Sequence, residues 1–127
     1  MKTLALSAAA LIALSACGPL QPQRSGLLDV IDRPAERALL AGIRAYDDGQ
    51  YADAEKQLQS ALAANLASPR DRAAAHKLLA FIYCTSQRVP ACEAAFRSAR
   101  SSDPGFALSH AEAGHPLWGP VYKRTLP

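Results

Sequence analysis

Three cysteines and three histidines are the side chains of this 127-residue sequence most able to take part in chemistry. Cys84 and Cys92 have seven residues between them, unlike the CxxC arrangement that lowers a thiol pKa for redox catalysis. The histidines show no HxxxH spacing suited to a zinc ion: His76, His110 and His115. Ser109 and His110 belong to no recognised nucleophile motif. We therefore predict no metal site, no cofactor and no enzymatic activity.

The third cysteine, Cys17, follows a segment typical of an export signal. Lys2 supplies a positive charge, and residues 4–16 are apolar except for two serines. Thirteen residues of helix measure about 20 Å, which is short of the ~30 Å hydrocarbon core of a bilayer. Residues 1–16 are therefore predicted to be a signal peptide rather than a membrane-spanning helix.

The residues around Cys17 indicate how this signal is processed. Leu14-Ser15-Ala16-Cys17 resembles the lipobox of bacterial lipoprotein precursors, in which the cysteine is acylated and becomes the first mature residue. Two acyl chains anchor a protein stably to a membrane. Gly18 resembles the sorting pattern of outer-membrane lipoproteins, so we expect a lipid anchor in the outer membrane and a domain facing the periplasm. An ordinary secretory signal with an incidental cysteine is the alternative.

The residues after Cys17 are expected to separate the anchor from a folded domain. Two prolines and two glycines over 18–26 discourage regular structure, so residues 17–31 are predicted to be the lipidated N-terminus and a tether. Beyond residue 16, thirteen Lys and Arg stand against eleven Asp and Glu, interspersed along the chain. This near-neutral balance argues against nucleic acid as a partner.

From residue 32 onward the apolar residues recur at steps of three and four, which predicts helices. The expected helices cover 34–48, 51–66, a segment from Pro69, and a segment from Pro90 to Asp103. Asp32 and Ser68 are the expected caps of the first and third helices, and Gly49 ends the first. No run of alternating β-branched residues competes with this pattern. The predicted fold class is all-α.

An internal repeat emerges when residues 35–68 are laid over residues 73–106. Residues of similar size coincide in these pairs: Gly42 and Ala80, Ala54 and Cys92, Leu58 and Phe96, Ala61 and Ala99. With the run Gly-Gln-Tyr-Ala-Asp-Ala over 49–54, the pattern resembles the tetratricopeptide repeat. The resemblance implies two helical hairpins over 32–106, a fragment of an α-solenoid. An unrelated four-helix bundle is the alternative.

Cys84 and Cys92 flank the turn predicted near residues 86–90, with one cysteine on each helix. An antiparallel hairpin brings such positions together, and the compartment reached after export oxidises thiols. We expect a disulfide between them, and two buried free thiols are the alternative.

Residues 107–127 depart from the repeat and are predicted to form an irregular cap. Ser109 and Glu112 match a capping box for one helical turn, while the apolar residues around Trp118 are too numerous for a free tail. We expect this segment to fold back over the end of the fourth helix. A partner-binding epitope centred on Trp118 is the alternative, since Trp and Tyr dominate interface hot spots.

Several stretches taken together resemble one group of proteins. They are His76 to Cys84, then Cys92 with Phe96-Arg97, and the run Ala113 to Tyr122. With the lipobox and the repeats, they are similar to the tetratricopeptide lipoproteins associated with some type VI secretion systems, the TssQ-like group. The resemblance implies an accessory role at the outer membrane, with a secretion-system component as the protein partner.

In a tetratricopeptide array the first helix of each pair lines a concave groove. The residues thereby assigned to partner binding are Leu39, Ile43, Tyr46, Lys77 and Phe81, with Trp118 from the C-terminal segment. An apolar strip edged by a lysine suits a partner helix, an extended peptide or the chain's own C-terminal segment. A pilotin-like or outer-membrane assembly factor is the second interpretation. A periplasmic thiol or metal-handling protein is the third.

Overall fold

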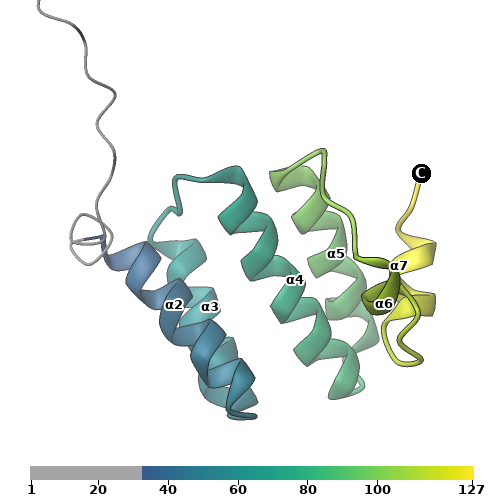
Figure 1. Cartoon of the computed structure of the whole chain (residues 1–127), viewed down its shortest axis with the longest axis horizontal. Coiled ribbons are helices and arrows are strands. Elements are labelled where there is room, and N and C mark those ends of the chain that lie inside the picture. Colours follow the sequence, from purple (N-terminus) through teal and green to yellow (C-terminus); the bar gives the residue numbers. More distant parts are fainter. Residues whose placement is uncertain (1–32) are drawn as a thin grey trace, which may run out of the picture.

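The computed structural model describes residues 33–127, and within that range the chain is all-α, as predicted. The signal peptide, Cys17 and the tether predicted over 17–31 lie outside the described residues. The helices (Figure 1) are α2 Pro34–Asp47, α3 Tyr51–Ala63, α4 Pro69–Thr85, α5 Val89–Ser102, α6 His110–Ala113 and α7 Gly119–Arg124. None of these described helices has the length and apolar character needed to cross a membrane.

Local sequence explains where α2 and α4 begin. Ser68 caps α4, because its hydroxyl accepts a hydrogen bond from the Asp71 backbone N–H at 3.2 Å. Arg33, rather than the expected Asp32, holds the N-cap position of α2 and makes no side-chain cap bond. Pro34 at the first helical position fixes φ there in its place.

The four long helices form two pairs, α2 with α3 and α4 with α5, and α4 also packs against α3 (Figure 1). Each pair is antiparallel and joined by a short turn. α3 ends at Ala63 rather than at residue 66, because Asn65 takes a φ of 62° and turns the chain toward α4. The largest fully buried side chains fill the space within and between the pairs: Phe96, Leu58, Leu66 and Cys92.

The two turns are built alike at positions 38 residues apart. The equivalent backbone bonds run from Gly49 to Tyr46 (3.0 Å) and Gln50 to Ala45 (2.8 Å), then from Gln87 to Cys84 (3.2 Å) and Arg88 to Tyr83 (2.8 Å). Burial follows the same register, since Leu58 and its counterpart Phe96 are both completely buried. The internal repeat is therefore present in the backbone and in the packing.

The C-terminal segment folds back on the second pair, with α7 packed on α5 and α6 packed on α7. Tyr122 is buried, and its ring meets that of Phe96 edge-on with centroids 5.3 Å apart. Its hydroxyl accepts a hydrogen bond from the Leu108 backbone N–H at 3.2 Å. Ser109 and Glu112 form the predicted capping box at the start of α6.

Helix α7 departs from the irregular segment expected over 107–127. Gly119 and Pro120 occupy the first turn of α7, where a proline needs no intrahelical N–H bond. The segment is therefore a cap with two short helices rather than an irregular one.

Candidate functional site

The residues predicted to bind a partner fall into two groups rather than one continuous face. Leu39 and Ile43 line an open hollow between α2 and the start of α4. Lys77 and Phe81 on α4 instead contact the C-terminal segment, to which Trp118 belongs. The two possibilities left by the sequence, an open groove and a groove filled by this segment, are each realised over one part of the face.

The open hollow, here named the α2–α4 groove, encloses about 400 Å³. Its lining residues are Arg33, Glu36, Leu39, Leu40 and Ile43 from α2, with Ser68 and Asp71 from the start of α4. Leu40 is 41% exposed, so part of the apolar wall is accessible. Charges of both signs stand at the rim, where Arg33 lies 3.9 Å from Glu36. An apolar strip with a mixed-charge rim is chemically suited to a segment of another protein.

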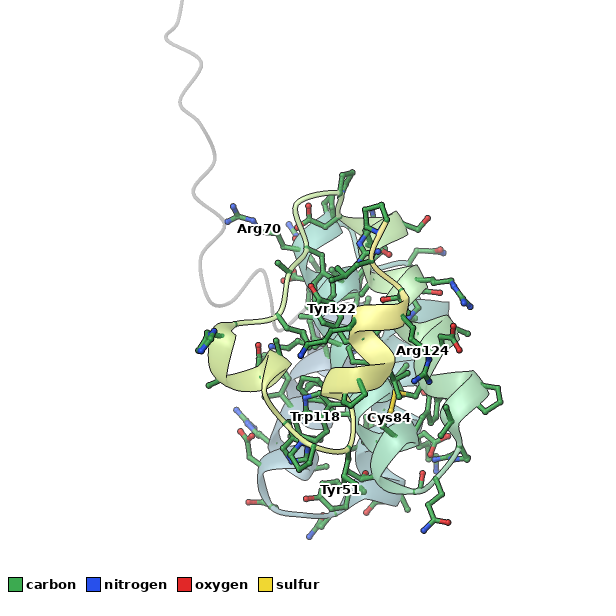
Figure 2. All side chains as sticks on the ribbon, turned by 90° about the vertical axis from the view of Figure 1, so that its right-hand side faces the viewer. Tyr51, Arg70, Cys84, Trp118, Tyr122 and Arg124 are labelled. Carbon is green, nitrogen blue, oxygen red and sulfur yellow. A yellow bond between two sulfur atoms is a disulfide. The ribbon has the colours of Figure 1, made fainter. Side chains whose placement is uncertain are left out.

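Over α4 the face is closed by Trp118. Its indole stacks on the Phe81 ring at a centroid distance of 4.1 Å and on the His115 ring at 3.4 Å. The indole N–H donates a hydrogen bond to the Glu112 carbonyl at 2.8 Å. Figure 2 views this side of the molecule, with Trp118 and Tyr122 both on the segment that covers the helices behind. Phe81 is only 4% exposed, because this part of the face is filled by the chain's own C-terminal segment, one of the occupants expected from the sequence.

An ion pair fixes the same segment to α4. Lys77 Nζ lies 2.7 Å from Glu112 Oε1, and each side chain is a little over one-quarter exposed. Burial alone would raise the pKa of Glu112, but hydrogen bonds from Lys77 and from the Ser109 backbone outweigh it, and the pKa is lowered. Lys77 is thus paired within the chain, and it also lines an open hollow between α4 and residues 103–107.

Tyr46 belongs to neither group. Its ring lies edge-on to that of Tyr51 with centroids 5.5 Å apart, at the turn that joins α2 to α3. Burial is the main cause that raises the pKa of Tyr46, and Tyr51, Asp47 and Glu112 add to it. Tyr46 is therefore a neutral, half-buried side chain at the turn between α2 and α3.

The cysteines predicted to bond lie together between α4 and α5. The sulfur atoms of Cys84 and Cys92 are 2.10 Å apart, and the Cα atoms 5.2 Å. Cys84 is 6% exposed and Cys92 is completely buried. A buried disulfide suits a structural bond better than thiol exchange, which requires an accessible sulfur. Among residues 33–127 no group of three or more His, Cys, Asp or Glu side chains could hold a metal ion.

The sequence reasoning missed Leu40 and Tyr122. Leu40 lies at one side of the apolar stripe that Leu39 and Ile43 define on α2, and it is the most exposed apolar residue in the wall of the groove. Tyr122 was noted only as one apolar residue of the C-terminal segment. Its burial against Phe96 depends on helix α7, which the sequence did not predict.

Comparisons with family models, with curated proteins and with solved structures give no match to this chain. The candidate site is therefore defined by its geometry: the α2–α4 groove, and beside it a face closed by the C-terminal segment.

Proposed function

We propose that this protein is a lipid-anchored interaction scaffold of the outer membrane, with two tetratricopeptide-type repeats, that binds a component of a type VI secretion system. The observation that carries the proposal is the α2–α4 groove. It stays open on a face whose other part is closed by the chain itself. Attachment to the membrane is assigned to Cys17, on the lipobox resemblance.

The repeat geometry supports the tetratricopeptide assignment. Two helical pairs share their turn bonds and their buried positions at a spacing of 38 residues. Stacked arrays of this kind usually need three or more repeats to bury their core. Here the C-terminal segment packs on α5, where a third unit would stack, and the disulfide cross-links the second pair.

The contact between two sequence runs supports the comparison with secretion-system lipoproteins. The run from His76 to Cys84 and the run from Ala113 to Tyr122 were two parts of that resemblance. They meet in the stack of Phe81 on Trp118. This contact covers the α4 part of the predicted binding face, and the α2–α4 groove is the part of that face that stays open to a partner.

The groove favours a protein partner over a small substrate. Leu40 and Ile43, with the edge of the largely buried Leu39, offer apolar contact over little more than one turn of α2, and Asp71 and Arg33 offer charges at the rim. A helix or an extended segment with apolar side chains spaced along one face matches such a strip. The buried disulfide and the absence of a nucleophile motif agree with a non-catalytic role.

Site-specific photo-crosslinking in cells tests this function. A crosslinker at position 40 should form an adduct with an envelope component of the secretion system, and Leu40→Glu should abolish the association. The matched control is a crosslinker at Lys56, an exposed residue of α3 that does not line the groove. The proposal is wrong if positions 40 and 56 give the same adducts, or if neither reacts with that machinery. Mass spectrometry of the mature N-terminus tests the acylation of Cys17 separately.

A further inference from the structure

Fifteen of the twenty-one charged side chains in residues 33–127 lie toward one of the two ends of the four long helices. One end holds the starts of α2 and α4 and the ends of α3 and α5, while the other end holds the two helix-pair turns (Figure 1). At the first end lie five arginines and three carboxylates: Arg33, Arg37, Arg70, Arg72 and Arg100, with Glu36, Asp71 and Asp103. At the turn end lie five carboxylates and two arginines: Asp47, Asp48, Asp53, Glu55 and Glu93, with Arg44 and Arg88. The molecule is therefore electrically polar along its helices.

Three of the five arginines at the first end are accessible. Arg33, Arg37 and Arg70 are exposed, and Figure 2 shows Arg70 projecting away from the helices. Arg72 is partly exposed and donates hydrogen bonds to the Leu66 and Ala67 carbonyls, at 2.7 and 3.0 Å, so it holds the turn there. The accessible charge of this end is therefore carried mainly by three arginines.

The same end is where the chain arrives from Cys17. Sixteen residues separate Cys17 from Pro34, the first residue of α2, and sixteen residues can span at most about 55 Å. A tether limits how far the domain moves from a bilayer but does not set which end faces it. An orienting force must come from the domain's own surface.

We propose that the domain rests on the membrane through this arginine-bearing end, with anionic phospholipid headgroups as its binding partner. The inference rests on the proposed attachment at Cys17, which keeps the end within reach of the headgroups. Basic residues near an anionic bilayer are attracted within roughly 8 Å of its surface, the screening length at physiological salt. The carboxylates of the turn end are repelled by the same surface, so both ends favour one orientation.

This orientation has a consequence for the α2–α4 groove. Arg33, Glu36 and Asp71 belong both to the membrane-facing end and to the rim of the groove. A partner segment in the groove therefore lies close to the bilayer, running beside the headgroups. The turn end, with Tyr51 and Arg88, faces away into the periplasm.

A polarity-sensitive fluorophore on a single added cysteine tests the orientation. The native acylated protein is inserted into vesicles of phosphatidylcholine with or without phosphatidylglycerol, and labelled in two variants. Ala67→Cys lies at the arginine-bearing end and Gln50→Cys at the turn end, and both positions are exposed. We expect a blue shift of emission at position 67 only, on the anionic vesicles only, that disappears in 0.5 M salt (about 4 Å screening length). Equal shifts at both positions, or none at position 67, overturn the inference.

Paired charge reversals separate orientation from net charge. Arg37→Glu with Arg70→Glu should abolish the shift at position 67, whereas Arg44→Glu with Lys56→Glu, which changes the net charge equally on other parts of the domain, should leave it. The inference is wrong if both pairs act alike. Flotation on neutral vesicles tests the proposed lipid anchor independently of the orientation. A chain that does not float with these vesicles contradicts acylation of Cys17. The orientation is then measured with the chain held on a chelating lipid through an N-terminal hexahistidine. A blue shift at position 67 alone again supports the inference, and equal shifts at both positions, or none at position 67, overturn it.

Discussion

Gly49 and Gln87 hold the same left-handed backbone conformation in equivalent turns, with φ of 74° and 61°. Glycine adopts this conformation without a steric penalty, whereas a residue with a Cβ loses about 1 kcal/mol. A Cβ at Gly49 would meet no atom within 4 Å, so the two turns differ in backbone preference and not in available space. The second helical pair therefore contains a strained residue where the first has a relaxed one.

Replacing Gln87 with glycine should stabilise the protein, and replacing Gly49 with alanine should destabilise it. The expected changes in the free energy of unfolding are a gain of roughly 0.5–1 kcal/mol and a loss of about 1 kcal/mol. Urea denaturation measures both. Gln50→Gly is the control, because Gln50 has a negative φ of −86° and should gain nothing. A Gln87→Gly variant less stable than the wild type would contradict the equivalence of the turns.

Gly42 marks the closest approach of α2 to α3. A Cβ at this position would lie 2.8 Å from Leu58 Cγ, so Gly42→Ala should cost about 1–3 kcal/mol through overpacking. Shortening Leu58 removes the two closest contacts and leaves only its backbone nitrogen, at 3.2 Å, so the double variant with Leu58→Ala should lose less than the sum of the single losses. Additive losses in denaturation experiments would show that the two helices do not meet at this point.

The spacing of apolar residues, together with the residues that start and end helices, was enough to predict the four long helices. Pro34, Ser68 and Gly49 gave their boundaries because each acts within one turn of the backbone. The early end of α3 at Ala63 was missed, since Asn65 is only a moderate signal for a left-handed residue and Leu66 continues the apolar pattern. Local rules therefore predicted the elements well and their exact ends less well.

The division of the binding face could not be predicted in the same way. The spacing of Lys77 and Phe81 indicates that they share one side of α4, but it carries no information on what covers that side. The cover comes from Trp118, 37 residues beyond Phe81, and from Glu112 of the short helix α6. Long-range packing of this kind depends on shape rather than on periodicity. The open part of the face depends in the same way on how the start of α4 lies against α2, where the two helices line the α2–α4 groove.

Loss of the bond between Cys84 and Cys92 should destabilise the second helical pair. The bond closes a loop with a sequence separation of 8, and a loop of this length is worth about 2.5 kcal/mol in the chain-entropy model. The double variant with alanine at both positions should lose approximately that amount in urea denaturation. The protein with both cysteines should lose stability in dithiothreitol, whereas the double variant should be insensitive to it. Equal stability of the two proteins without reductant would contradict a structural bond.

The ion pair between Lys77 and Glu112 should make attachment of the C-terminal segment sensitive to acid. The pKa of Glu112 is lowered in the fold, so its contribution is complete above the unfolded value of about 4.5 and is lost as the pH falls through the lower, folded value. Glu112→Gln should lose about 1 kcal/mol at neutral pH and show a weaker pH dependence below 4.5.

Fluorescence of Trp118, the only tryptophan, reports this attachment directly. Glu55→Gln is the control, since Glu55 pairs with Arg88 between α3 and the second turn and should leave the tryptophan signal unchanged. If the pH dependence of the tryptophan fluorescence were the same in Glu112→Gln and in the wild type, the ion pair would not hold the segment.

Trp118→Ala should release the C-terminal segment from α4 while the two helical pairs stay folded. The substitution removes the stacks on Phe81 and His115 and the hydrogen bond to the Glu112 carbonyl, so about 2–4 kcal/mol should be lost. Amide hydrogen exchange should become faster in α6 and α7 and change little in α2 and α3. Neither α2 nor α3 packs against α6 or α7. Leu117→Ala is the matched control, since Leu117 is 53% exposed and should change stability by less than about 0.5 kcal/mol. If Trp118→Ala were equally mild, Trp118 would be better explained as a partner-binding residue than as part of the cap.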